Sequence, residues 1–116
     1  MHIDFYDFGR IKIEGEVYER DMIIFPDRIF SPWTRKQGHY LDAQELSLIP
    51  DLLKEKPELV IIGIGYSGAM QVNPDVEEFF KTKRIEIIIQ KTIDAWKTYN
   101  ELSQSKKTIA LLHLTC

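Results

Sequence analysis

The sequence predicts an α/β protein, a three-layer sandwich with a mixed, mainly parallel sheet and an N-terminal antiparallel β extension. Apolar runs at residues 59–64, 85–90 and 108–114 are separated by two stretches with helical periodicity. Apolar runs without polar alternation are typical of parallel strands that are covered on both faces. The alternation of strand and helix patterns predicts a βαβαβ core with right-handed crossovers. Since 116 residues is an ordinary domain size, we expect a single domain over residues 1–116.

Short strands joined by tight turns are expected in roughly the first forty residues. The stretch "RIKIEGEVYER" (10–20) alternates apolar and polar side chains around Glu14-Gly15, which is typical of a half-buried hairpin. The stretch "MIIFPDRIF" (22–30) repeats this pattern around Pro26-Asp27. The preceding "DFYDF" (4–8) is expected to be a further strand whose apolar side chains are covered by its neighbours.

Capping signals mark the starts of three helices. Asp42, three residues before a glutamate, resembles a capping box that opens a short helix, and Pro50 predicts a kink or a fresh start beyond it. Asn73 is a favourable N-cap, and Pro74 suits the first helical position. Thr92 is expected to cap the last helix in the same way.

Composition and charge exclude several classes of function. The chain is 44% hydrophobic and 28% charged, and its net charge of −3 gives no overall attraction to nucleic acid or to an anionic membrane. No apolar run approaches the roughly 18 residues of a membrane-spanning helix, and the N-terminus lacks the features of a signal peptide. We therefore expect a cytoplasmic location, no nucleic-acid partner and no membrane insertion. Cys116 is the only cysteine, and the three histidines lack metal-ligand spacing, so no metal or cofactor is expected.

A ligand site in an open α/β sheet is expected at the carboxyl ends of the parallel strands. The segments Gly63–Gly68, Gln90–Thr92 and His113–Cys116 reach that edge. The first has the spacing G-x-G-x-x-G, but the helix cap lies five residues beyond the last glycine, and no acidic residue ends the second strand. We interpret it as a loop whose glycines allow a sharp turn and a close approach to a neighbour. The alternative is a non-nucleotide ligand or partner held by the loop amides.

A second candidate is the loop "WTRKQGHYLD" (33–42), because loops with aromatic and basic side chains often bind partners. The alternative is that Trp33 and Tyr40 plug the end of the sheet while His39 is a packing residue. His113 is expected to be a satisfied histidine at the end of a strand. No residue is assigned a catalytic role. The candidate binding residues are Trp33, Arg35, His39, Tyr40, Gly63, Gly65, Tyr66, Ser67, Thr92 and Asn100.

Several stretches together resemble one family of small uncharacterised α/β domains. They are "FGRIKIEGEVY" (8–18), "VIIGIGYSG" (60–68), "QKTIDAWKTYNEL" (90–102) and "ALLHLTC" (110–116). The family includes the mitochondrial complex I assembly factor 3 and the adipogenesis-associated domain protein. The resemblance spans essentially the whole chain and implies a three-layer fold, no established reaction, and a role in assembly or interaction.

The resemblance also maps family positions onto this chain. The family's glycine loop, threonine cap and last-helix asparagine correspond to Gly63, Gly65, Thr92 and Asn100. Ile64 departs from the pattern, because the family commonly has threonine between the two glycines. The loss of that hydroxyl weakens the case for chemistry at the loop.

Three hypotheses follow from these observations. The leading one is a non-enzymatic binding or assembly module that contacts a protein partner near the strand ends and the loop 33–40. The alternative is a small-molecule-binding protein or enzyme with its site at Gly63–Gly68, where Thr92 and His39 supply polar groups. The third is a homo-oligomer built on an exposed edge strand of the N-terminal hairpin.

Overall fold

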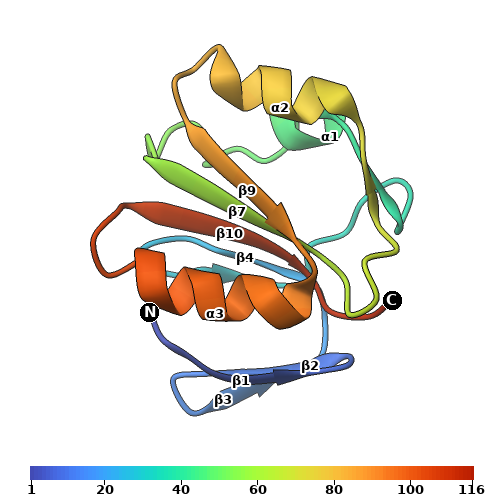
Figure 1. Cartoon of the computed structure of the whole chain (residues 1–116), viewed down its shortest axis with the longest axis vertical. Helices are drawn as coiled ribbons and strands as arrows, with labels where there is room; N and C mark the ends of the chain where they lie inside the picture. The colour runs from blue at the N-terminus through green and yellow to red at the C-terminus, as the bar shows by residue number, and fades with distance from the viewer.

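A five-stranded mixed sheet runs through the middle of the molecule (Figure 1). The computed structural model describes all of residues 1–116. The strand order is β5-β4-β10-β7-β9, in which β10, β7 and β9 are parallel and β4 and β5 are antiparallel to their neighbours. The bounds are Met22–Ile24 for β4, Ile29–Phe30 for β5, Leu59–Ile64 for β7, Glu86–Gln90 for β9 and Thr108–His113 for β10.

Two layers cover this sheet, one on each face (Figure 1). Helices α1 (Ala43–Ser47) and α2 (Pro74–Lys81) lie on one face. Helix α3 (Thr92–Leu102) lies on the other face together with a three-stranded antiparallel sheet. The small sheet consists of β1 (Ile3–Asp7), β2 (Arg10–Ile13) and β3 (Glu16–Tyr18), and β6 (Tyr40–Leu41) pairs separately with β8 (Gln71–Val72). The predicted three-layer α/β sandwich with a mixed sheet is confirmed.

The apolar core is divided by the central sheet into two clusters. Val60 and Ile62 of β7 pack in the cluster beneath α1 and α2, whereas Leu59 and Ile61 pack in the cluster beneath α3 and the small sheet. Because successive side chains of a strand point to opposite faces, a strand covered on both faces needs apolar residues at every position. The unbroken apolar run of β7 has this cause. The third run, β9, lies at the edge and is only half-buried.

Two of the predicted helix starts are confirmed and one is wrong. The carboxylate of Asp42 accepts a hydrogen bond from the Glu45 amide (3.0 Å), and the side chain of Asn73 accepts one from the Asp75 amide (3.0 Å). Helix α3, however, has Lys91 at its N-cap and no side-chain cap. The hydroxyl of Thr92 is not free to cap α3, since it bonds to two other segments of the chain.

The N-terminal strands form as predicted, with two corrections. The second hairpin, β4-β5, belongs to the central sheet and not to a separate extension, because β4 pairs with β10. The apolar side chains of residues 4–8 are not all covered: Tyr6 is buried, but Phe5 and Phe8 are each 55% exposed. The small sheet packs one face on α3, and on its outer face Phe5 and Val17 are 55% and 49% exposed. None of the helices has the length and apolar composition needed to cross a membrane.

Candidate functional site

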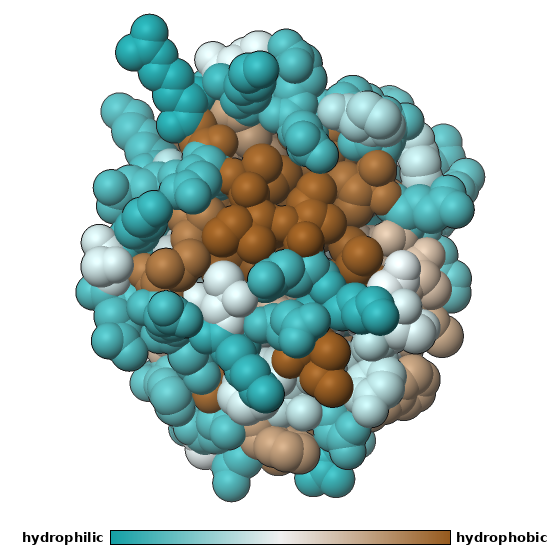
Figure 2. Space-filling model, viewed as in Figure 1, coloured by the Kyte–Doolittle hydropathy of each residue, from teal (hydrophilic) through white to brown (hydrophobic).

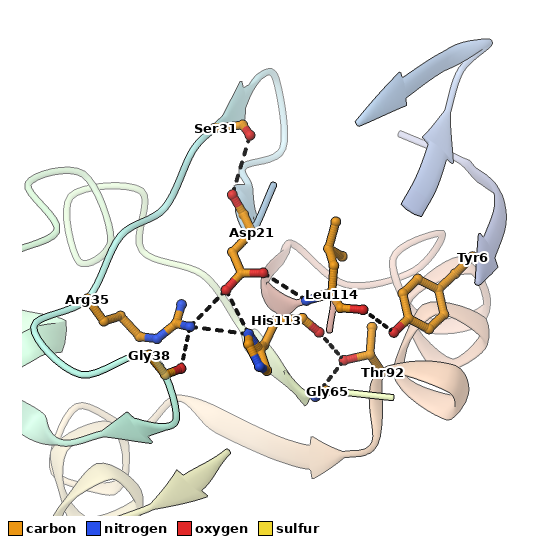
Figure 3. A network of polar contacts seen from close by, with 9 residues as sticks. All are labelled: Tyr6, Asp21, Ser31, Arg35, Gly38, Gly65, Thr92, His113 and Leu114. Atoms are coloured by element: carbon orange, nitrogen blue, oxygen red, sulfur yellow. Dashed lines mark hydrogen bonds and ion pairs between the residues drawn. The ribbon is translucent and has the colours of Figure 1, made fainter. Parts of the chain in front are cut away.

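The three segments expected at the carboxyl ends of the parallel strands do lie together (Figure 3). The Thr92 hydroxyl donates to the carbonyl oxygen of His113 (2.6 Å) and accepts from the Gly65 amide (2.9 Å). A Cβ atom at Gly63 would lie 2.8 Å from the Thr92 hydroxyl oxygen, closer than real Cβ atoms approach. The glycine therefore makes room for the first turn of α3.

The C-terminal segment bonds to several polar groups at the glycine loop, and the amide of Gly68 bonds within the loop to the Gly65 carbonyl. The Tyr66 amide donates to the backbone carbonyl of Thr115 (3.0 Å). The Ala69 amide and the Ser67 hydroxyl both donate to the backbone oxygen of Cys116 (2.8 Å each). Gly65 has φ +104°, and a Cβ there would lie 2.3 Å from the Cys116 carbonyl carbon. The five main surface hollows are all lined by residues outside this loop. The loop thus serves close contact within the chain.

A buried charged cluster lies next to the loop (Figure 3). Asp21 Oδ2 is 2.7 Å from His113 Nδ1 and 2.8 Å from Arg35 Nη2, and Asp21 Oδ1 accepts from the Leu114 amide (2.8 Å). The side chains of Arg35, His113 and Asp21 are 2%, 5% and 17% exposed. Asp21 immediately precedes β4, and β4 pairs with β10, so the carboxylate is held beside the end of β10.

Hydrogen bonding fixes the protonation within this cluster. A carboxylate only accepts hydrogen bonds, so Nδ1 of His113 carries a proton and donates it to Asp21. The 3.2 Å separation between Arg35 Nη2 and His113 Nδ1 then joins two donors and is not a hydrogen bond. Burial by itself would raise the pKa of Asp21, but the hydrogen bonds from His113, the Leu114 amide and Arg35 outweigh it and lower that pKa.

The cluster orients a histidine but shields its second nitrogen. His113 Nε2 is buried without a hydrogen-bond partner, as are Nε and Nη1 of Arg35. The ring of His39 packs edge-on against His113, with ring centroids 5.3 Å apart. An Asp–His pair is the arrangement that prepares an imidazole for proton transfer, but here a substrate would have to reach a buried nitrogen. No three His, Cys, Asp or Glu side chains are grouped as metal ligands.

The other candidate residues lie around the cluster and the glycine loop, except for Tyr40 and Asn100. Trp33 is 4% exposed, and the Arg35 guanidinium lies over its ring at 4.4 Å. The Tyr40 hydroxyl accepts a hydrogen bond from the side chain of Asn73. Tyr66 is 38% exposed and packs against Phe8. The site residues that the structure brings together are Trp33, Arg35, His39, Gly63, Gly65, Tyr66, Ser67 and Thr92.

Asn100 lies apart from these residues. Its side-chain oxygen accepts from the Ile3 amide (2.8 Å), and its side-chain nitrogen donates to the Ile3 carbonyl (2.7 Å). Both polar atoms are therefore used to join α3 to β1, at the opposite end of the helix from Thr92.

Sequence reasoning missed Asp21, which makes the most contacts in the cluster. Asp21 and His113 are 92 residues apart, and neither lies in a spaced motif. An aspartate directly before an apolar strand is an ordinary turn residue. Only the pairing of β4 with β10 brings the two side chains together, so the sequence held no local signal.

An apolar groove opens beside the loop 33–42, which we call the Trp33 loop, and next to the edge strand β5. It encloses about 260 Å³. Phe25 and Trp33 form a buried floor, while Phe30 (52% exposed) and Leu48 (68% exposed) form a rim. Exposed large apolar side chains around a hollow are typical of an interaction site.

The charged groups around this apolar groove are mainly acidic. The guanidinium of Arg28 lies 4.2 Å from the centroid of the Phe25 ring and makes ion pairs with Asp51 (2.7 Å), Asp27 (2.7 Å) and Glu55 (3.2 Å). Three carboxylates surround this cation, of which Glu55 also lies 3.8 Å from Lys107 Nζ, and the groove is lined by a further carboxylate, that of Glu45. The rim therefore carries an excess of negative charge.

Comparison with known proteins places the chain in a family. The family model described as "Protein of unknown function (DUF498/DUF598)" matches residues 3–113. The chain is similar to the conserved hypothetical protein PH1505 from Pyrococcus horikoshii OT3, with 28% identity, a TM-score of 0.81 and 100% of both chains covered. It is also similar to MT938, with 27% identity, a TM-score of 0.74, and 99% and 98% of the two chains covered. A Bordetella pertussis protein described as a Mth938-like domain shares the fold at 13% identity, with a TM-score of 0.66 and 97% and 85% covered. The chain belongs to the DUF498/DUF598 family of proteins of unknown function.

Proposed function

We propose that this protein is a non-enzymatic binding module that docks a basic, amphipathic segment of a protein partner in the apolar groove. The observation that carries this proposal is the exposure of Phe30 and Leu48 above the buried rings of Phe25 and Trp33. A partner side chain that entered the groove would remove this apolar surface from water, at roughly 25 cal/mol per Å². The apolar anchor would supply most of the affinity.

The acidic rim supports a basic partner. The positive charge of Arg28 is already compensated by Asp27 and Asp51, and Glu45 adds another negative charge at the groove. Lysine or arginine side chains on either side of an apolar anchor would meet this potential favourably, whereas acidic side chains would be repelled.

A role in binding rather than catalysis is supported by the buried cluster and by the resemblance. The free nitrogen of His113 is shielded, and the amides of Gly65, Tyr66 and Gly68 in the glycine loop are bonded within the chain. The motifs that resemble those of the complex I assembly factor and the adipogenesis-associated protein favour an assembly role, and we propose a cytoplasmic location.

The test is a selection of random peptides displayed on phage against the purified protein. Enriched peptides are expected to carry a large apolar residue flanked by lysine or arginine. Leu48→Lys should reduce their affinity at least tenfold, because it removes an apolar rim residue and adds a repelling charge. Leu48 is a better position for this test than Trp33, whose 4% exposure makes it part of the core.

Val17→Lys is the matched control, since Val17 is also an exposed apolar residue (49%) but lies on the small sheet. It should leave peptide affinity unchanged. Peptides that bind Leu48→Lys as well as the native protein, or enriched peptides that are acidic, would refute the proposal. Loss of binding in Val17→Lys alone would move the site to the outer face of the small sheet.

A further inference from the structure

The two edges of the central sheet are protected to different degrees. β5, at one edge, has only two residues, whereas β9, at the other, has five and contains the consecutive isoleucines Ile87, Ile88 and Ile89. Proteins guard exposed edges with short strands, proline, lysine or bulges, because unpaired backbone groups are a template for another strand. β9 has none of these devices between its first and last residue.

Alternate residues of β9 present their backbone groups outward. The Glu86 amide donates to the backbone carbonyl of Glu58, directly before β7 (3.1 Å). Within the sheet, β9 pairs only with β7. Since backbone groups alternate in direction along a strand, Glu86, Ile88 and Gln90 face β7. The amide and carbonyl groups of Ile87 and Ile89 therefore point away from the sheet and have no partner strand.

Apolar side chains surround this free backbone. Ile87 and Ile89 pack partly against the cluster beneath α2, and Ile88 packs partly against the cluster beneath α3. In Figure 2, hydrophobic side chains gather in the zone between α2 and α3, where β9 faces the viewer in Figure 1. A surface with both unpaired backbone groups and apolar side chains is suited to the addition of a strand.

We infer that β9 pairs with β9 of a second copy of this chain, antiparallel and about a two-fold axis at Ile88. In this register Ile87 of one copy lies opposite Ile89 of the other, so the outward groups of both residues bond to each other. Glu86 lies opposite Gln90 of the second copy, whose amide can donate to the carboxylate. No like charges face each other within the strand pair.

The neighbouring two-fold registers need backbone groups that are already occupied. An axis at Ile87 would use the amide of Ile85, which donates to Phe80 (3.0 Å). An axis at Ile89 would use the carbonyl of Lys91, which accepts from the amides of Asp94 (2.9 Å) and Ala95 (2.8 Å). The Ile88 register alone uses groups that are free in the single chain.

A two-fold contact of this kind closes after two copies, because each β9 satisfies the other. Pairing of the same edge with β5 of the next copy would instead continue indefinitely. A standard interface buries about 800 Å² on each partner, which corresponds to about 20–30 residues a side. The edge strand β9 has only five residues, so a smaller buried area is expected. We therefore expect a reversible dimer with a dissociation constant in roughly the micromolar range.

Amide hydrogen exchange followed by NMR tests the register without any substitution. In a dimer of this register, the amides of Ile87 and Ile89 gain protection as protein concentration rises from the low micromolar to the millimolar range. The amide of Ile88 bonds to β7 in either state and shows no such dependence. Exchange of Ile87 and Ile89 that is independent of concentration would overturn the inference.

Ile89→Pro tests the dimer itself by sedimentation analysis. The ring removes an outward amide, which no bond within the chain uses, and edge strands tolerate proline. The mass is expected to fall from that of two chains to that of one. Ile87→Lys should have the same effect and serves as the second variant if the proline disrupts folding.

Phe30→Lys is the matched control, because it places lysine on the opposite edge strand. It should leave the dimer intact while impairing peptide binding in the groove. Ile89→Pro should dissociate the dimer while leaving peptide binding unchanged. The outcomes for the proposed function and for the dimer are therefore separable. A dimer that survives both β9 substitutions, or one that Phe30→Lys dissociates, would refute the pairing of β9.

Discussion

Asp21 joins parts of the chain that are far apart in the sequence. Its carboxylate bonds to Arg35, His113 and the amide of Leu114, and its carbonyl oxygen accepts from the Trp33 amide (2.7 Å). The buried guanidinium of Arg35 has no other carboxylate partner. A buried cation that loses its counter-ion is strongly destabilising, so the charge of Asp21 is a condition for the packing of the Trp33 loop.

Asp21→Asn is expected to destabilise the protein by about 3 kcal/mol, because the Arg35 charge would remain buried without an anion. Urea unfolding at neutral pH measures this loss. Asp94→Asn is the control: Asp94 is an exposed residue in the first turn of α3, and its substitution should cost about 0.5 kcal/mol or less. Equal effects of the two substitutions would contradict the role given to Asp21.

The difference in stability between the native protein and Asp21→Asn depends on pH, and the direction of this dependence follows from the pKa of Asp21. The pKa of Asp21 is lowered in the folded protein from its ordinary value of 3.8, so the unfolded chain takes up this proton more readily. The contribution of Asp21 to stability is therefore present above about pH 4 and is lost as the pH falls through the lower, folded-state pKa. Between pH 5 and pH 2, the native protein should lose more stability than Asp21→Asn does.

Gly65 is required by a close backbone contact, and Gly38 provides the matched comparison. A Cβ at Gly65 would overlap Cys116 at a φ of +104°, whereas a Cβ at Gly38 meets nothing within 4 Å. Gly65→Ala should lower the free energy of unfolding by at least about 2 kcal/mol, and Gly38→Ala should change it by less than about 0.5 kcal/mol. Thermal denaturation of both variants checks this difference, and equal melting temperatures would refute it.

At the scale of elements, α3 joins the two sheets. Its inner face packs against β7 through Ala95 and Tyr99, and Asn100 bonds to both backbone groups of Ile3 in β1. Burial and the nearby charge of Glu14 raise the pKa of Tyr99 to about 12. The phenol is therefore neutral at physiological pH, and this contact is not sensitive to pH in that range.

Asn100→Ala should loosen the small sheet while leaving the central one unchanged. The substitution removes two hydrogen bonds and leaves the Ile3 amide and carbonyl without partners, a loss of about 1–3 kcal/mol. Amide exchange is expected to quicken in β1 and β2 but not in β7 or β10. Asn73→Ala, which removes the N-cap of α2, should instead lower the stability of α2 by about 1 kcal/mol. Unchanged exchange in β1 would show that Asn100 does not anchor it.

At the scale of the whole molecule, the features predicted from sequence were those that depend on neighbouring residues. The unbroken apolar runs located β7 and β10, where burial on both faces demands them, and also the half-buried edge strand β9. The caps at Asp42 and Asn73 were evident because a cap bonds within its own first turn. These two kinds of signal were sufficient for the α/β sandwich.

Features that depend on distant parts of the chain could not be read in this way. The cap expected at Thr92 was wrong because tertiary contacts with Gly65 and His113 use its hydroxyl. The exposure of Phe5 follows from an uncovered sheet face, which no pattern within β1 reveals. The contact of Asp21 with His113 arises from the pairing of two strands nearly a full chain length apart.

The apolar groove and the unprotected strand β9 lie at opposite edges of one sheet. Joining two copies through β9 would produce a continuous ten-stranded sheet with a groove at each far end. At a spacing of about 4.8 Å per strand, the two grooves would stand roughly 40 Å apart. A partner with two basic segments at that separation would be held bivalently, and its avidity would exceed the affinity of either groove by about a hundredfold or more. The β9 edge, which binds no partner protein itself, would then set the distance between the two grooves and so determine which partners the protein can bring together.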